Sequence, residues 1–200
     1  MKKLYFVLFF SIFVLSVFSQ RIVKLGVRGG LNFSNPQVSA KTSEGRMGFH
    51  AGPTIEVDPL KKFGFASGVY FNVNGFNYTY ENDRKDIETS KVSIYSLDMP
   101  ITVDYRQEIV KKLLAAFLET GPYINMGLNG VQEIKTKIEG RDVVVDKDFM
   151  YNDIDYGVLF GGGLELAFLK VGVNYNLGLA KLGDMMDGKN RILKVYISLR

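Results

Sequence analysis

The chain has 200 residues, of which 46% are hydrophobic and 23% are charged, a composition typical of one folded domain and unlike that of a disordered or collagen-like chain. It contains no cysteine and one histidine, His50, which excludes disulfides, cysteine-ligated metals and sites that need two histidines. Two of its 25 basic residues, Lys2 and Lys3, lie in a segment that we expect to be removed. The other 23, against 21 acidic residues, do not indicate nucleic-acid binding.

The N-terminus has the pattern of a targeting signal. Two lysines precede an apolar stretch, Leu4 to Phe18, which is shorter than the roughly 20 residues that a membrane-spanning helix needs. Val17-Phe18-Ser19 suits signal peptidase, with cleavage after Ser19. We therefore predict a signal peptide at residues 1–19 and an exported domain at residues 20–200; the alternative is an uncleaved N-terminal anchor.

After residue 20 the hydrophobic pattern has a period of two. Between Tyr95 and Tyr105 every odd position is apolar, and Asp98 and Asp104 are among the residues between them. Successive side chains of a β-strand point to opposite faces, so this alternation predicts a strand with one apolar and one polar face. Eight such runs follow in chain order, at about residues 23–33, 46–57, 63–80, 95–105, 113–128, 154–168, 169–179 and 193–199.

The polar faces decide between a soluble and a membrane protein. They are rich in glycine, which suits the narrow interior of an eight-stranded barrel. They also carry charges of both signs that can pair inside a closed lumen, whereas a soluble barrel or sandwich would place them in water. We predict an all-β fold, an eight-stranded antiparallel transmembrane β-barrel of the outer-membrane type. Its inward charges are Lys24, Arg28, Arg46, Lys170, Lys194, Glu56, Asp98, Asp104, Glu119, Asp155 and Glu165.

The connections alternate in length. Residues 58–62, 106–112 and 168–169 are short, and residues 35–45, 81–91, 129–152 and 181–190 are long and polar. This alternation predicts short periplasmic turns and longer extracellular loops. The longest loop, 129–152, has the pattern of a projecting hairpin around Glu139-Gly140-Arg141-Asp142.

Alternation also predicts which residues meet lipid and which fill the barrel. An interior filled by side chains leaves no continuous water column, so we expect a barrel that does not conduct. The expected lipid contacts are Leu97, Ile101, Val103, Val158, Phe160, Val171 and Val173. The expected interior also includes Tyr70 and Tyr123, and the tyrosines expected at the membrane interfaces are Tyr78, Tyr80, Tyr95, Tyr105, Tyr151 and Tyr175.

Four motifs resemble the PorT-like outer-membrane β-barrel family of the Bacteroidetes. They are Val27-Arg28-Gly29-Gly30-Leu31-Asn32-Phe33-Ser34, Tyr95-Ser96-Leu97-Asp98-Met99-Pro100-Ile101, Gly121-Pro122-Tyr123, and Asp155-Tyr156-Gly157 followed by Gly161-Gly162-Gly163-Leu164-Glu165. The resemblance extends over the exported domain and implies a cell outer-membrane barrel. Its name-giving member serves type IX protein secretion. Such chains usually end on an aromatic residue, whereas this one ends Ser198-Leu199-Arg200.

Two classes of function compete. The first is a non-enzymatic structural or accessory subunit of an envelope assembly, related through the resemblance to type IX secretion. Its partners would be outer-membrane lipid and envelope or secretion proteins bound through loop 129–152, with no nucleic acid, cofactor, metal or catalytic residue. The alternative is a membrane-embedded lipid hydrolase or acyltransferase using His50, although spacing identifies no partner for this residue.

Two further features have ordinary structural interpretations. The acids Asp98, Asp104, Glu119, Asp155 and Glu165 could form a cation path, but a paired structural network is expected in so narrow a barrel. Asp184 and Asp187, beside Gly183 and Gly188, match no complete calcium loop, so a solvated turn is expected there.

Overall fold

The computed structural model describes residues 23–34, 37–38, 43–81, 87–111, 113–138, 141–148, 154–183 and 186–200, and the regular structure in these residues is β-strand. The predicted signal peptide, residues 1–19, lies outside the described residues. In the part of the chain that is described, no helix is long and apolar enough to span a bilayer.

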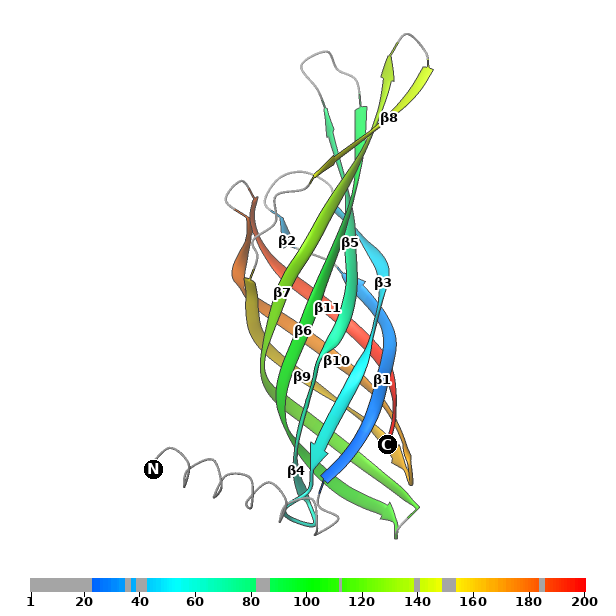
Figure 1. Ribbon diagram of the computed structural model, residues 1–200, viewed down its shortest axis with the longest axis vertical. Helices are drawn as coiled ribbons and strands as arrows, with labels where there is room; N and C mark the ends of the chain where they lie inside the picture. The colour runs from blue at the N-terminus through cyan, green and yellow to red at the C-terminus, as the bar shows by residue number, and fades with distance from the viewer. Residues whose placement is uncertain are drawn as a thin grey trace, which may run out of the picture.

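The strands form one antiparallel sheet that closes on itself, because β1 pairs with both β3 and β11 (Figure 1). β4 and β5 follow one another at a single position between β3 and β6, so the ring has eight strand positions and the predicted eight-stranded barrel is confirmed. The ring strands are β1 (Val23–Ser34), β3 (Ser43–Val57), β4 (Phe63–Gly68), β5 (Tyr70–Glu81), β6 (Ile87–Val110), β7 (Leu114–Ile138), β9 (Ile154–Leu166), β10 (Leu169–Gly183) and β11 (Met186–Leu199).

Two short strands lie at the end of the barrel with the long loops. β2 (Gln37–Val38) pairs with β11, and β8 (Arg141–Asp148) pairs with β7 from Val131↔Asp148 to Ile138↔Arg141. The hairpin predicted in loop 129–152 is thus confirmed where the loop is described. Together with the ends of β5 and β6 it rises well above the rest of the barrel (Figure 1).

Several strands are longer than alternation predicts. The loop expected at 81–91 contains strand as far as Glu81 and again from Ile87, and β6 continues through the turn expected at 106–112 as far as Val110. These ends keep ladder partners, such as Thr89↔Lys135 and Glu108↔Ala115. Alternation fades there because both faces of a strand can be polar once it leaves the membrane, while the backbone ladder continues.

The faces of the strands are those expected for a barrel in lipid. Ile101, Phe160 and Val173 expose between 44% and 62% of their surface, although they are large and apolar. Leu97 and Val158 are half-buried on the same outward face. The side chains between them point inward, and the buried ones include Asp98, Asp104, Glu119 and Asp155. An apolar outside around a polar inside is the arrangement that lipid requires.

We expect Val173→Arg to destabilise the barrel by about 2–4 kcal/mol, because Val173 lies mid-strand on the outward face and a charge there enters the hydrocarbon. The measurement is the free energy of unfolding in urea, in lipid vesicles, with Val173→Leu as the control. An arginine that costs no more than the leucine would contradict the outward placement.

Candidate functional site in the barrel lumen

The lumen near the short turns holds a cluster of ionised side chains, the charge cluster. Five cations and five carboxylates of the described residues belong to it, so its formal charges cancel. Pairing of this kind is what makes buried charge tolerable. The members are Lys24, Arg28, Arg106, Lys170, Arg200, Glu56, Asp58, Asp104, Glu119 and Glu165.

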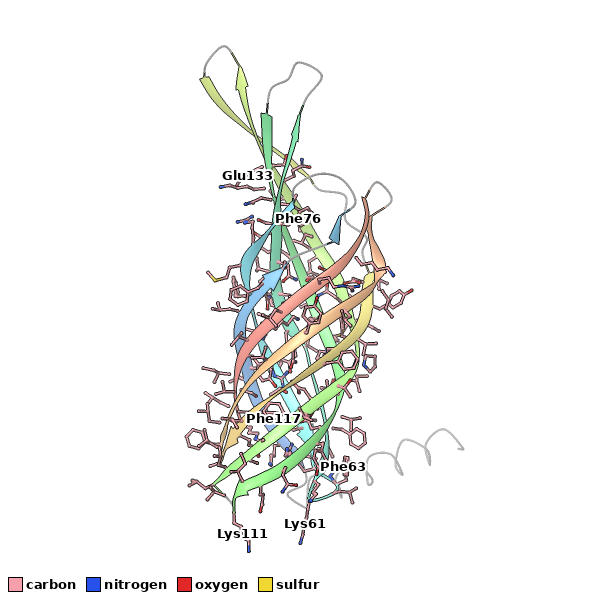
Figure 2. All side chains as sticks on the ribbon, turned by 180° about the vertical axis from the view of Figure 1, so that it is seen from behind. Lys61, Phe63, Phe76, Lys111, Phe117 and Glu133 are labelled. Carbon is pink, nitrogen blue, oxygen red and sulfur yellow. The ribbon has the colours of Figure 1, made fainter. Side chains whose placement is uncertain are left out.

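Lys170 lies at the centre of the charge cluster and is fully buried. Its Nζ is 2.7 Å from Asp104 Oδ2, 3.6 Å from Glu56 Oε1 and 3.9 Å from Glu119 Oε2. The same nitrogen lies 4.2 Å from the centre of the Phe117 ring, in the lower part of the barrel (Figure 2). One ammonium group therefore holds together three carboxylates from three different strands.

Arg106 joins the charge cluster to the rim. Its guanidinium lies 2.6 Å from Asp58 Oδ2, 3.3 Å from Glu56 Oε2 and 3.1 Å from Glu165 Oε2. Arg200 also binds Glu56 and Glu165. The turn predicted at residues 106–112 is wrong at Arg106, because β6 extends past this residue. Its even number, shared with the inward residues Asp98 and Asp104, is the signal that could have identified it.

Asp58 is the acid at the rim of the charge cluster. Burial alone would raise the pKa of its carboxyl, but hydrogen bonds from Arg106 and Lys24 outweigh burial and hold that pKa below its usual value. The Lys24 Nζ lies 2.9 Å from Asp58 Oδ2. The carboxylate is therefore ionised at neutral pH and closes the cluster at the short-turn end of the barrel.

Arg28 is stacked between two aromatic rings in the middle of the barrel. Its Cζ lies 4.0 Å from the centre of the Tyr196 ring and 5.5 Å from that of Tyr70. The Tyr196 hydroxyl donates to Glu119, whose other oxygen lies 3.7 Å from Arg28. Gly172 makes this stack possible, because a Cβ at this position would overlap the Tyr196 ring.

The outer half of the lumen holds fewer charges. Lys194 donates to Asp98, and Asp155 accepts hydrogen bonds from Asn190 Nδ2 at 3.1 Å and from the Tyr123 hydroxyl at 3.4 Å. Asp98, Asp104 and Glu119 are thus paired with lysines of the protein. Such pairing is expected of a structural network, whereas a cation path would need carboxylates that are free to bind passing ions.

Buried apolar side chains complete this outer filling. Val92 and Ile94 of β6 point inward with Phe76 of β5, which is directly opposite Val92 and lies high in the barrel (Figure 2). These three residues are not among the side chains that the sequence pattern predicts for the interior. Val92 and Ile94 continue the inward numbering of β6 from Asp98, and Phe76 continues that of β5 from Tyr70.

His50 forms part of a neutral network. Its Nδ1 is 2.7 Å from Asn32 Oδ1, and its ring meets the Tyr70 ring edge-on at 6.1 Å. Asn32 also donates to Asn72 and Asn74. Catalysis of the proposed kind needs a nucleophile beside the base and a path for lipid. His50 instead contacts an amide and a phenol, is 3% exposed, and lines a cavity of about 10 Å³.

The other candidate residues are only partly described. Tyr105 and Tyr175 are exposed on the outer surface and Tyr95 is half-buried there. Tyr151 and Asp184 lie outside the described residues, and the side chains of Tyr78, Tyr80 and Asp187 lie outside the described part as well. The expected solvated turn at Asp184 and Asp187 therefore stays a prediction.

Residues 18–183 match the family described as outer membrane protein beta-barrel domain. The chain belongs to this family. It is a small β-barrel protein of the outer membrane, and the short turns of the barrel are its periplasmic side. No curated protein sequence matches it.

Solved outer-membrane barrels are similar in architecture. The attachment invasion locus protein Ail of Yersinia pestis is 12% identical, with a TM-score of 0.42 over 88% of this chain and 96% of that one. Neisserial surface protein A is 11% identical, with a TM-score of 0.47 over 88% and 97%. The N-terminal β-barrel domain of Pseudomonas aeruginosa OprF is 10% identical, with a TM-score of 0.39 over 86% and 96%.

We expect Lys170→Met to destabilise this outer-membrane barrel by about 3–5 kcal/mol, because the change removes the near cation of the buried Asp104 carboxylate and leaves the charge cluster with one negative charge in excess. The measurement is urea unfolding in vesicles, with Lys189→Met at an exposed lysine as the control. Adding Asp104→Asn to Lys170→Met should recover part of the loss. Equal effects of the two lysine variants would contradict the role given to Lys170.

We also expect the purified barrel to carry no steady current in a planar lipid bilayer. The cavity between Arg28, His50, Asp98 and Tyr196 holds about 10 Å³, no more than one water molecule occupies. Stable unit conductance of porin size would contradict a filled lumen. The heat-treated, unfolded protein serves as the control for contaminating channels.

Proposed function

We propose that this protein is a non-enzymatic accessory subunit of an outer-membrane assembly, and that it binds a partner protein through the β7–β8 hairpin. The projection of this hairpin beyond the barrel is the observation that carries the proposal (Figure 1). β6 and β7 have 24 and 25 residues, more than twice the roughly 9–11 that cross a bilayer. The excess length builds a sheet outside the membrane.

The filled lumen supports this assignment by elimination. The charge cluster, the Arg28 stack and the apolar side chains of the outer half occupy the interior. A ligand that entered would have to break buried ion pairs, which is costly. Binding is therefore expected at the ends of the barrel and not within it.

The hairpin offers a specific mode of binding. β8 ends the strand order of the sheet, and within the described ranges its pairing is with β7 alone. The other edge of β8 then presents unpaired backbone N–H and C=O groups, which an extended segment of another protein can use by adding a strand. Such an edge suits a permanent subunit, because a free edge left exposed favours aggregation.

More specifically, we propose that the assembly is a type IX protein secretion system. This proposal is supported by the resemblance of the strand motifs, such as Val27–Ser34 and Tyr95–Ile101, to the PorT-like family. The Asp98 carboxylate of the second motif binds Lys194 inside the barrel. This motif therefore has a structural role in the fold, and the hairpin supplies the contact with the partner.

The test is to remove the hairpin without disturbing the barrel. Gln132 and Lys147 are directly paired, so replacing residues 133–146 by Asn-Gly joins them with a two-residue turn. We expect the shortened protein to insert normally but to lose co-purification with secretion-system envelope proteins after cross-linking in native membranes.

The matched control shortens the neighbouring hairpin. Thr79 and Thr89 are paired, so replacing residues 80–88 by Asn-Gly trims β5–β6 and leaves β8 in place. This control should retain the partners. If the β7–β8 variant keeps the same partners as the full-length protein, the proposed function is wrong.

A further inference from the structure

The periplasmic rim of the barrel carries basic side chains on its outer surface. Lys61 and Lys62 lie in the turn between β3 and β4, and Lys111 lies in the turn between β6 and β7; all three are exposed. Lys61 and Lys111 extend from the lower end of the barrel (Figure 2). The charge cluster has equal numbers of cations and carboxylates, and none of these three lysines takes part in its ion pairs.

One of these lysines belongs to a small polar cluster on the outside of the barrel. The Lys62 Nζ lies 3.3 Å from Gln107 Oε1, and the Tyr105 hydroxyl lies 3.4 Å from the same oxygen. The Gln107 amide nitrogen is 3.4 Å from the carbonyl oxygen of Glu108, whose side chain lies on the opposite face of β6. An ammonium group has three donors, so Lys62 keeps two for a ligand.

Aromatic and apolar surface lies directly against this polar cluster. The rings of Phe63 and Tyr105 are paired across β4 and β6, with centres 5.3 Å apart, and expose 46% and 37% of their surface. The next outward-facing pair along the two strands, Phe65 and Val103, belongs to the apolar outer surface that contacts lipid. The donors therefore lie where the lipid-contacting surface ends and the periplasm begins, at the depth of the phosphate groups of the inner leaflet.

We propose that Lys62 and Gln107 bind the phosphate of a phospholipid headgroup, with the Tyr105 hydroxyl holding Gln107 in place, while Phe63 packs against the acyl chains of the lipid. Lys61 and Lys111 add attraction for an anionic headgroup. A basic side chain near a membrane surface strengthens binding to anionic lipid by about fivefold. The site is continuous with the apolar outer surface of the barrel. This favours a phospholipid over free phosphate, because free phosphate would make no contact with the rings of Phe63 and Tyr105.

The test uses the folded protein in a neutral detergent at low salt, with bound lipid counted by native mass spectrometry. The probes are phosphatidylglycerol, phosphatidylcholine and inorganic phosphate. We expect phosphatidylglycerol to bind several-fold more tightly than phosphatidylcholine. Lys62→Gln should weaken phosphatidylglycerol binding about fivefold, Lys62→Arg should retain it, and the control Lys189→Gln, at the long-loop end, should not change it.

Each other result overturns the proposal. Unchanged binding by Lys62→Gln, or an equal loss in Lys189→Gln, would show that the polar cluster is not a lipid site. Displacement of the lipid by millimolar inorganic phosphate would assign the site to free phosphate. A gel-mobility shift on heating verifies that every variant is folded.

Discussion

The structure depends on one constraint: eight strands enclose a lumen too narrow for bulk water, so each buried carboxylate has to be paired with a cation or, like Asp155, to accept hydrogen bonds from its neighbours. Lys170 meets this constraint by contacting carboxylates of β3, β6 and β7 at once. Lipid imposes a second requirement on the backbone, whose hydrogen bonds have to be made between strands. The pairing of β1 with β11 closes the ring and leaves no ring edge in the membrane.

The interior changes character along the barrel axis. Ion pairs fill the periplasmic half, where Arg106 and Lys170 join several acids. Arg28 and the tyrosine rings occupy the middle, and apolar side chains such as Phe76 lie buried towards the outer end. His50 contributes a neutral link to Asn32 within this sequence of layers. The histidine therefore has a structural explanation that needs no substrate.

Because the interior is filled, we expect binding at the two ends of the barrel. These ends differ in the groups that they expose. At the outer end β6 and β7 extend beyond the membrane and carry the free edge of β8, which suits a protein partner. At the periplasmic end the chain turns sharply, and Lys62 and Tyr105 both lie against Gln107 on the outer surface, where we propose that a lipid headgroup binds. We therefore propose that one barrel carries a protein-binding surface at one end and a lipid-binding surface at the other, with the paired charges of the lumen between them.

Alternation in the sequence by itself determined the class of fold, the eight strands and the face to which residues such as Asp98 and Val173 belong. It could do so because lipid outside and a polar lumen inside impose a period of two on every spanning strand. The tertiary structure alone decided which charges meet: Arg106 binds Glu56 from 50 residues away, and Arg200 reaches the same acid from 144 residues away. It also decided how far β6 and β7 continue, because outside the membrane strand pairing no longer leaves a periodic pattern. Pairing partners depend on register and closure around the ring, which no local pattern records.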